Sequence, residues 1–217
     1  MFAAMVGQKQ SQIDYSVLVK ALIAPVQHAG SVIMDIYQSD LSTETKADGS
    51  PVTKADHAAE AILLAEIATL APSIQIISEE NAPSHELAAS QEFFLVDPLD
   101  GTKEFIKACG DGAFTVNIGL IKNAEPVMGI VFAPALDRLF FGSLGNGAFE
   151  ISGGICRQIR VRMPPAEGPV AVASASHRDA QTNQWLEKRG IINSIAIGSS
   201  LKFCLIAAGE ADLYPRY

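Results

Sequence analysis

Apolar side chains recur at helical spacing through the first part of the chain. Within residues 14–38 they stand three or four positions apart, at Val17, Leu18, Leu22, Ile23 and Val26. This spacing predicts an amphipathic helix, with a kink or break where Pro25 and Gly30 interrupt the pattern. The polar segment 39–53 predicts a mobile loop or hairpin. A second helix should run from near Thr53 to about Leu70.

Shorter apolar runs indicate strands in the rest of the chain. Residues 74–78 (IQIIS) and 92–96 (EFFLV) are typical of buried strands. Residues 114–134 predict a hairpin, and residues 137–154 predict further strands joined by glycine-marked turns. The remainder predicts, in order, a strand and loop (169–177), a helix closed by Gly190 (179–190), and a strand, a helix and a short final strand (194–217). Helices first, a meander next and alternating elements last suggest layered α and β structure.

Composition narrows the class of protein. A chain of 217 residues with 48% hydrophobic and 18% charged residues can form one globular domain or two joined lobes. The net charge of −8 argues against binding nucleic-acid polymers or anionic membranes, although a small anion could still bind in a local cationic pocket. We expect no signal peptide, because MFAAMVGQKQ lacks a charged leader followed by a long apolar core. We expect no integral membrane segment, because no uninterrupted apolar run reaches roughly 18 residues. Cys109, Cys156 and Cys204 lack metal-binding spacing, which favours free structural thiols in a reducing cytoplasm.

Acidic residues cluster where apolar segments end. Asp56 follows SPVTKA, Glu79-Glu80 follows IQIIS, and Asp97 and Asp100 follow FFLV. Magnesium takes carboxylate, carbonyl and water oxygens. Glu79, Asp97 and Asp100, with the carbonyl of Leu99, could therefore supply a metal shell.

Each acidic group also has a purely structural interpretation. Asp56 stands three residues after Thr53, as in a capping box, and taken alone capping is favoured over catalysis. Glu79-Glu80 alone indicates a solvated turn, and Asp100-Gly101-Thr102 alone indicates a type I turn or helix cap. Only the clusters taken together favour a metal site.

Gly101-Thr102 adds a feature that a simple turn does not need. If a helix begins there, its first N–H groups can receive a phosphate. Glycine allows close approach of the backbone, and the Thr102 hydroxyl can orient water. Metal-binding carboxylates beside a phosphate-binding helix start predict metal-assisted phosphoryl transfer to water.

These motifs carry a resemblance to a known family. DPLDGTKEF, together with the SPVT-x-AD element at 50–56 and the Glu79-Glu80 strand end, resembles the signature of the inositol monophosphatase-like, lithium-sensitive, magnesium-dependent phosphatases. The variant DGTKEF, with DGAFTVNIGLI and GSSLKFCLIAAGEADLYPR, resembles the bisphosphate nucleotidase branch rather than true inositol monophosphatases, which usually read DGTTNF. The resemblance spans residues 14–216 approximately.

The resemblance implies an α/β (α+β) fold, a layered αβαβα sandwich of the inositol monophosphatase and fructose-1,6-bisphosphatase type. It implies two or three magnesium ions (Mg2+), held by Glu79, Asp97, the Leu99 carbonyl and Asp100. Thr102, with Asp56 behind it, would align the attacking water and help to deprotonate it. Substrate would contact Glu79, Asp100, Gly101, Thr102, His177, Ser199, Lys202 and Arg216, with the second phosphate near the last three and His177 near the nucleoside. From the residues alone, a snorkelling surface position for Lys202 and a surface ion pair for Arg216 stay open.

The chain departs from the family pattern at its end. Family members continue past YPRY with a WD-x-AAG segment, whose aspartate completes a second metal site. We therefore expect a weakened second site and a truncated final layer in an incomplete C-terminal α/β lobe, residues 164–217, carrying the nucleotide-binding residues. Residues 1–163 would form the α+β lobe with the metal and phosphate site.

The implied activity is removal of the 3'-phosphate from 3'-phosphoadenosine 5'-phosphate, a small nucleotide bisphosphate, to give AMP and phosphate in sulfate assimilation. The alternatives are an inositol monophosphatase and a truncated, non-catalytic form that binds nucleotide or metal. The resemblance implies a monomer or homodimer in the cytoplasm, with peripheral association with the inner membrane as an alternative location.

Overall fold

The computed structural model of the protein describes residues 13–39, 43–45, 51–86, 88–106, 112–174 and 178–216. The helices are α1 (Tyr15–Ala21), α2 (Ile23–Ser39), α3 (Lys54–Leu70), α4 (Ala82–His85), α5 (Thr102–Ile106), α6 (Ala180–Lys188) and α7 (Leu201–Ala207), with a 3-10 turn η1 at Pro134–Leu136. The strands are β1 (Thr43–Thr45), β2 (Pro51–Thr53), β3 (Gln75–Ser78), β4 (Glu92–Asp100), β5 (Thr115–Lys122), β6 (Glu125–Ala133), β7 (Arg138–Ser143), β8 (Gly147–Ser152), β9 (Ile155–Ile159), β10 (Ala171–Ser174) and β11 (Ser194–Ile197).

The main sheet has seven strands in the order in which the chain makes them, from β3 to β9. β3 pairs with β4 in parallel, and every later neighbour is antiparallel. A second sheet pairs β10 and β11 in parallel, with α6 in the connection between them. This connection is the crossover that parallel strands require.

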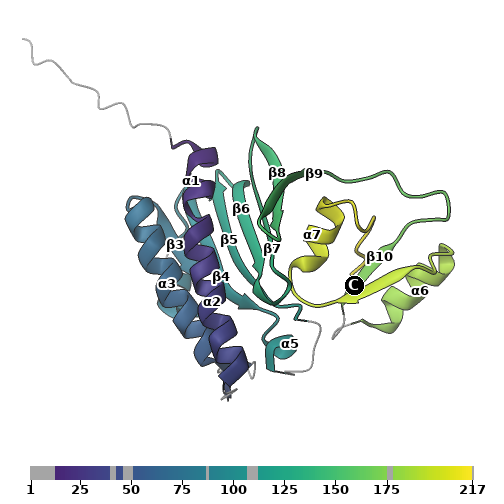
Figure 1. Ribbon diagram of the computed structural model, residues 1–217, viewed down its shortest axis with the longest axis horizontal. Helices are drawn as coiled ribbons and strands as arrows, with labels where there is room; N and C mark the ends of the chain where they lie inside the picture. Colours follow the sequence, from purple (N-terminus) through teal and green to yellow (C-terminus); the bar gives the residue numbers. More distant parts are fainter. Residues whose placement is uncertain are drawn as a thin grey trace, which may run out of the picture.

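The layers alternate across the molecule (Figure 1). α2 and α3 cover one face of the seven-stranded sheet, and α7 lies on its other side, next to both β6 and β10. The β10–β11 sheet follows, with α6 beyond it. This α, β, α, β, α order confirms the layered sandwich that the sequence motifs implied.

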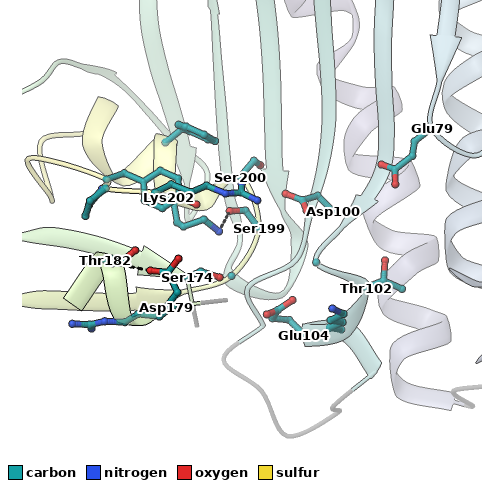
Figure 2. A pocket seen from close by; sticks show the side chains of 18 residues that line it. Glu79, Asp100, Thr102, Glu104, Ser174, Asp179, Thr182, Ser199, Ser200 and Lys202 are labelled. Carbon is teal, nitrogen blue, oxygen red and sulfur yellow. Dashed lines mark hydrogen bonds between the residues drawn. The ribbon is translucent and has the colours of Figure 1, made fainter. Parts of the chain in front are cut away.

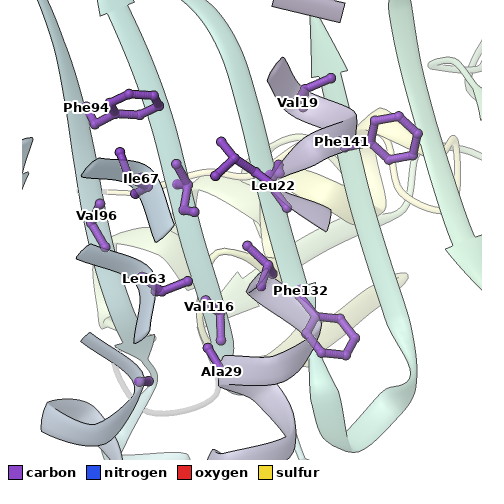
Figure 3. Close-up of a cluster of buried hydrophobic side chains, with 14 of the residues drawn as sticks. Val19, Leu22, Ala29, Leu63, Ile67, Phe94, Val96, Val116, Phe132 and Phe141 are labelled. Carbon is purple, nitrogen blue, oxygen red and sulfur yellow. The ribbon is translucent and has the colours of Figure 1, made fainter. Parts of the chain in front are cut away.

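The core lies between the two long helices and the main sheet (Figure 3). Leu22 and Leu63 point from the helices towards Phe94 and Val116 of the sheet, and all four side chains are fully buried. Burying a side chain of this size stabilises the fold by about 1.5–3 kcal/mol. The apolar periodicity of the first helices is therefore explained by this one interface.

The first helical segment breaks at Leu22, so the expected break at Pro25 or Gly30 is wrong. Pro25 is the third residue of α2, within the first turn, where a missing N–H costs little. Gly30 continues the helix and lets it approach β6. A Cβ added at Gly30 would lie 2.4 Å from a ring carbon of Phe132.

Replacement of Gly30 tests this close approach. We expect Gly30→Ala to lower the free energy of unfolding by about 1–2 kcal/mol, because overpacking outweighs the gain of about 1 kcal/mol in helix propensity. Urea denaturation measures the change. Gly119→Ala is the matched control, because a Cβ there would have no neighbour within 4 Å. Equal stability of the two variants would contradict the packing argument.

The segment Tyr15–Gln38 is long and apolar enough, by length and composition alone, to cross a membrane. It is interrupted at Leu22, and Val26, Ala29 and Ile33 are completely buried in the core. This packing is typical of a core helix and agrees with the expectation of no integral membrane segment.

Other sequence predictions have mixed outcomes. The 39–53 hairpin, as β1 and β2, the helix ending at Leu70 and the helix before Gly190 are confirmed. The 155–159 strand was not predicted, and the final strand is reduced to a single bridge between Ala171 and Leu213.

The cysteines whose placement the structure describes are free. Cys156 is exposed and Cys204 is buried, while Cys109 lies outside the described residues. Burial raises the pKa of the Cys204 thiol to about 12. Cys204 is therefore a packing residue of α7, as the sequence suggested.

Candidate active site

A cavity of about 400 Å³ opens between the start of α5 and the loop that precedes α7 (Figure 2). Among its lining residues are Glu79, Asp100, Gly101, Thr102, Ser199, Lys202 and Arg216, all of them predicted from the sequence. Residues more than 100 positions apart thus meet at one place. His177 lies outside the described residues, so its proposed position near the nucleoside stays a prediction.

The end of β4 forms one wall of the cavity. The β4–β5 pairing shifts register between Asp97 and Asp100, which marks a bulge in β4. The N–H of Leu99 donates to Oδ1 of Asp97 at 3.2 Å, and the Thr102 hydroxyl donates to the Leu99 carbonyl at 3.2 Å. Gly101 then turns the chain with φ of +91°, a conformation that favours glycine. The hydrogen bonds and the turn within residues 97–102 therefore bring the oxygen atoms of this segment close together.

Asp97 lies in an acidic and buried environment. Burial, followed by the charges of Glu79 and Asp100 and a hydrogen bond with Glu79, raises the pKa of Asp97 to about 8. Asp97 and Glu79 also line a second hollow of about 420 Å³, on the sheet face away from α2 and α3. Glu79 borders both the hollow and the cavity. Because Glu79 and Asp100 repel the charged form of Asp97, a cation bound here would relieve that repulsion.

The donor atoms here suit a hard cation. Carboxylates from Glu79, Asp97 and Asp100 and the Leu99 carbonyl provide oxygens alone, the type that magnesium prefers. Within the described ranges, however, no three acidic, histidine or cysteine side chains lie close enough together to hold an ion. The residue types and their electrostatics fit magnesium, and their role as ligands stays a prediction.

Residues of α3 and α4 hold the end of β3, which precedes Glu79, in place. The buried Ser78 hydroxyl donates to Glu60 of α3, and the Ser78 carbonyl lies 2.7 Å from Nε2 of His85. Ser84 accepts from the Ser78 N–H at 3.1 Å, and the Glu79 N–H donates to the Val96 carbonyl at 2.9 Å. These contacts fix the backbone that presents Glu79 to the cavity.

Asp56 forms the capping box that its spacing predicted. Its Oδ2 accepts from the Thr53 N–H at 2.8 Å and from the Thr53 hydroxyl at 2.7 Å. Asp56 is completely buried and is not among the residues that line the cavity. α5, which begins at Thr102, packs beside β2, which ends at Thr53, so the cap and Thr102 lie on neighbouring elements.

The loop before α7 forms the opposite wall. Ser199 adopts a positive φ of 49°, and Gly198 sits so close to the first wall that an added Cβ would lie 2.7 Å from Cγ of Glu104. The ammonium group of Lys202 donates to the Ser199 carbonyl and lies 5.6 Å from the centre of the Tyr214 ring. Lys202 is only 7% exposed, so it is no snorkelling surface residue.

Charges from the two walls interact across the cavity. Burial raises the pKa of Asp100, while Lys202 and the Ser200 backbone N–H act in the opposite direction. Burial lowers the pKa of Lys202, opposed by the charges of Asp100 and Glu104. Arg216 adds a second cation near Lys202. The cavity is therefore acidic at the β4 end and cationic at the α7 end.

Sequence reasoning missed several residues of this site. Ser200 donates to Oδ1 of Asn117 at 2.6 Å and lies 2.9 Å from the Thr115 hydroxyl. Asn117 pairs with Asp97 across the sheet and Thr115 pairs with Asp100. Ser200 thus joins the second wall to the partners of both carboxylates. The pair Ser199-Ser200 before an apolar run could have indicated the start of a helix. No local sequence pattern indicated that Ser200 contacts residues of the main sheet.

Glu104 was also missed, although it belongs to the quoted DGTKEF motif. It is buried, lines the cavity and is the third residue of the short helix α5. That position places it on the face of α5 that meets Gly198. A helix beginning at Thr102 would have been enough to predict its position.

Comparisons with known proteins give one consistent answer. Residues 14–217 match the profile of the inositol monophosphatase family. The chain is 43% identical over 194 residues to the 3'(2'),5'-bisphosphate nucleotidase CysQ of Escherichia coli (strain K12), covering 88% of this chain and 77% of that protein. It is 45% identical, with the same coverage, to CysQ of Salmonella typhimurium (strain LT2). The crystal structure of CysQ from Bacteroides thetaiotaomicron superposes with a TM-score of 0.78 at 33% identity, covering 95% of this chain and 82% of that one.

Proposed function

Because the chain belongs to the inositol monophosphatase family and is therefore a phosphatase, we propose that it hydrolyses the 3'-phosphate of 3'-phosphoadenosine 5'-phosphate. The products are AMP and inorganic phosphate, and the reaction would clear a by-product of sulfate assimilation. One observation carries the choice of substrate: carboxylates and the buried Lys202 line opposite ends of a single cavity. A substrate with two phosphates has a group for each end, whereas an inositol monophosphate has only one.

We propose magnesium as the cofactor, held by Glu79, Asp97, Asp100 and the Leu99 carbonyl. The oxygen-only donor set and the raised pKa of Asp97 support this assignment. When bound, magnesium supplies Lewis-acid activation of the phosphate and of the attacking water. The expectation of two or three ions remains a proposal. Titration calorimetry with magnesium would measure the number of ions and their affinities.

Residues of the first wall prepare the attack on the phosphate. The Thr102 hydroxyl donates to the Leu99 carbonyl and can accept a hydrogen bond from a water, which orients that water towards the cavity. We assign Asp56 the role of carboxylate behind Thr102, on the element that neighbours α5. Gly101 brings the backbone close to the transferred phosphate, because it has no side chain in the cavity.

Residues of the second wall would hold the phosphate that is not cleaved. Lys202 and Arg216 supply two positive charges, and Ser199 lies between Lys202 and the first wall. Charge-assisted hydrogen bonds of this kind are about twice as strong as neutral ones. The cationic end therefore selects for a second anionic group, and His177 remains assigned to the nucleoside.

The first experiment is phosphate release from 3'-phosphoadenosine 5'-phosphate, with and without magnesium, beside inositol 1-phosphate. We expect magnesium-dependent release from the nucleotide and much slower release from the inositol ester. Faster release from inositol 1-phosphate would favour the inositol monophosphatase alternative. Nucleotide binding without release from either substrate would identify the non-catalytic form.

The contact between Glu60 and Ser78 gives a prediction about magnesium affinity. We expect Glu60→Ala to raise the magnesium concentration at half-maximal activity by roughly tenfold, because the strand end that presents Glu79 loses its contact with α3. Titrating activity against magnesium checks this result. Glu66→Ala, on the exposed side of the same helix, is the control. An unchanged titration in Glu60→Ala would contradict the supporting role of Ser78.

The remaining proposals concern organisation. We keep the division into a metal-binding lobe (1–163) and a nucleotide-binding lobe (164–217), with the boundary between the two sheets. The reported relatives are bacterial, and we place the protein in the bacterial cytoplasm as a monomer or homodimer. Cell fractionation would contradict the location if the protein sedimented with membranes. Light scattering would decide between monomer and homodimer.

A further inference from the structure

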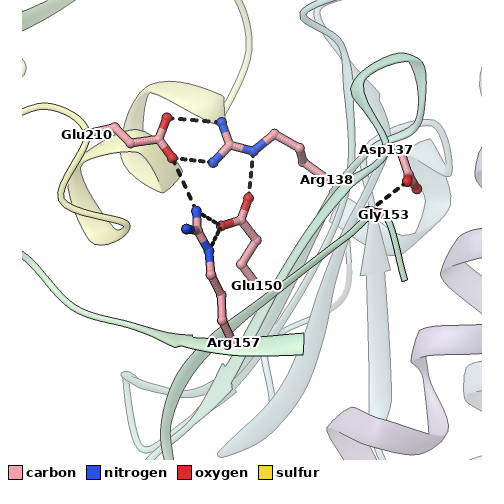
Figure 4. Close-up of polar contacts among 6 residues, drawn as sticks. All are labelled: Asp137, Arg138, Glu150, Gly153, Arg157 and Glu210. Carbon is pink, nitrogen blue, oxygen red and sulfur yellow. Dashed lines mark hydrogen bonds and ion pairs between the residues drawn. The ribbon is translucent and has the colours of Figure 1, made fainter. Parts of the chain in front are cut away.

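A cluster of four charged side chains lies outside the cavity, at the far end of α7 (Figure 4). Arg138 begins β7, Glu150 lies on β8, Arg157 lies on β9, and Glu210 follows α7. Arg138 contacts both carboxylates: its Nε donates to Glu150 at 2.6 Å, and its terminal nitrogens donate to the two oxygens of Glu210. Arg157 donates to the other Glu150 oxygen at 2.8 and 2.6 Å.

This cluster is more buried and makes more hydrogen bonds than an ordinary surface ion pair. Glu150 is only 1% exposed, and both of its oxygens accept from arginine. Burial opposes ionisation, but the two arginines outweigh it and lower the pKa of Glu150. The Arg138 guanidinium also lies 4.9 Å from the centre of the Phe140 ring. Arg138 is therefore held rigidly, and its bidentate contact fixes the position of Glu210.

The cluster and the cavity are joined by one short, stiff element. α7 has seven residues and is about 10 Å long, with Lys202 in its first turn and Glu210 just beyond its last. The Glu210 N–H donates to the Leu205 carbonyl at 2.9 Å, which closes the helix end. At the other end, Ser200 is bonded to Asn117 and lies beside Thr115 of β5. The main sheet thus holds both ends of α7.

We propose that Glu210, held by Arg138, is a positioning residue for Lys202. Glu210 fixes where Lys202 lies in the cavity and thereby determines how a second phosphate is recognised. The substrate part of this proposal rests on the proposed function. The described side-chain hydrogen bonds and ion pairs of Arg138 and Glu210 are with Glu150, Arg157 and each other, away from the β4 end of the cavity. We therefore expect an effect on Lys202 to pass through α7. A displacement of α7 moves Lys202 relative to Asp100, and the distance between the two phosphate positions changes with it.

The first test compares two substrates in Glu210→Gln. We expect KM for 3'-phosphoadenosine 5'-phosphate to rise about tenfold, because a small misplacement of a binding group weakens recognition strongly. KM for adenosine 3'-monophosphate, which lacks the second phosphate, should change less than about twofold. Arg138→Lys should behave in the same way, because lysine cannot form the bidentate contact. Glu92→Gln is the matched control, since Glu92 accepts from Tyr15 and pairs with Lys122 far from α7. Equal KM changes for both substrates would overturn the proposal.

A second measurement keeps the proposal separate from the identity of the substrate. Lys202 is buried, so its amine should react slowly with acetic anhydride in the native protein. We expect Glu210→Gln, but not Glu92→Gln, to speed acetylation of Lys202 several-fold, as measured by mass spectrometry of the peptide. Unchanged labelling would overturn the positioning role. If the wild-type protein releases no phosphate from the nucleotide while labelling changes as expected, the proposed substrate fails and the positioning role stands.

Discussion

Asp97→Asn should reduce the rate of phosphate release about a thousand-fold and should also make the metal-free protein more stable. The loss of rate follows because a proposed magnesium ligand loses its charge, and a thousand-fold corresponds to about 4 kcal/mol. The gain in stability follows from the acidic surroundings of Asp97, whose pKa is about 8 in the folded protein against an ordinary 3.8.

The difference between these two pKa values determines whether the stability of the folded protein rises or falls with pH. Below about pH 4 the carboxyl group is protonated in both the folded and the unfolded chain. Between the two pKa values the unfolded chain releases the proton and the folded chain retains it. Rising pH therefore favours unfolding until the folded pKa of about 8 is passed. Asparagine carries no such proton, so its advantage grows across this window and then levels off.

Thermal unfolding in a chelator between pH 4 and pH 9 measures this effect. The difference in Tm between Asp97→Asn and wild type should widen with pH, and saturating magnesium should raise Tm of the wild type alone. Asp35→Asn, at an exposed position on α2, is the control. A Tm difference that stays constant across the pH range would contradict the assigned environment of Asp97. Full activity of Asp97→Asn would contradict the proposed role of Asp97 as a magnesium ligand.

Lys202→Met should raise KM for 3'-phosphoadenosine 5'-phosphate by about 10- to 100-fold. A charge-assisted hydrogen bond to phosphate contributes roughly 1.5–3 kcal/mol, and each 1.4 kcal/mol is a factor of ten. The side chain is buried and methionine has a similar length, so the cavity should keep its shape. The loss for adenosine 3'-monophosphate should be smaller, because this substrate offers no phosphate to the cationic end.

Steady-state kinetics on both substrates measures the change, with Lys122→Met as the control because Lys122 pairs with Glu92 on the main sheet. Circular dichroism should show an unchanged fold in both variants. A change in kcat without a change in KM would assign Lys202 to the reacting end instead. Equal kinetics of Lys202→Met and wild type would exclude Lys202 from substrate binding.

The sequence was most informative where periodicity is strong. The long helices were predicted because their apolar positions follow one buried face, from Leu22 to Leu63. The strand 155–159 was missed because ICRQI has too few apolar residues and most of it is exposed. Gly30 was misjudged because a glycine that breaks a helix and one that admits a neighbouring strand look alike in sequence. The neighbours that distinguish them, Phe132 and Pro134, lie more than 100 positions away along the chain.

For the candidate site, the motifs predicted residues that lie in one continuous stretch of the chain. Asp100, Gly101 and Thr102 lie in one continuous stretch and all three line the cavity, whereas Asp97 lines the second hollow. Ser200 was missed because its partners are 83 and 85 positions away. Glu210 and Arg138 were missed for the same reason, as 72 positions separate them. Contacts between distant segments arise from packing of the layers, which no local pattern encodes.

The order of the strands also determines when the cavity comes into being during synthesis. Every strand from β3 to β9 pairs with a neighbour that the ribosome has just made, so the main sheet needs no later segment to close. Glu79 follows β3, and Asp97 and Asp100 lie in β4, so all three are synthesised before residues 199–216. The cationic wall is synthesised after the whole main sheet, and we expect it to form when α7 docks onto that sheet. A chain that folds during synthesis would therefore order the acidic half of the cavity before the cationic half.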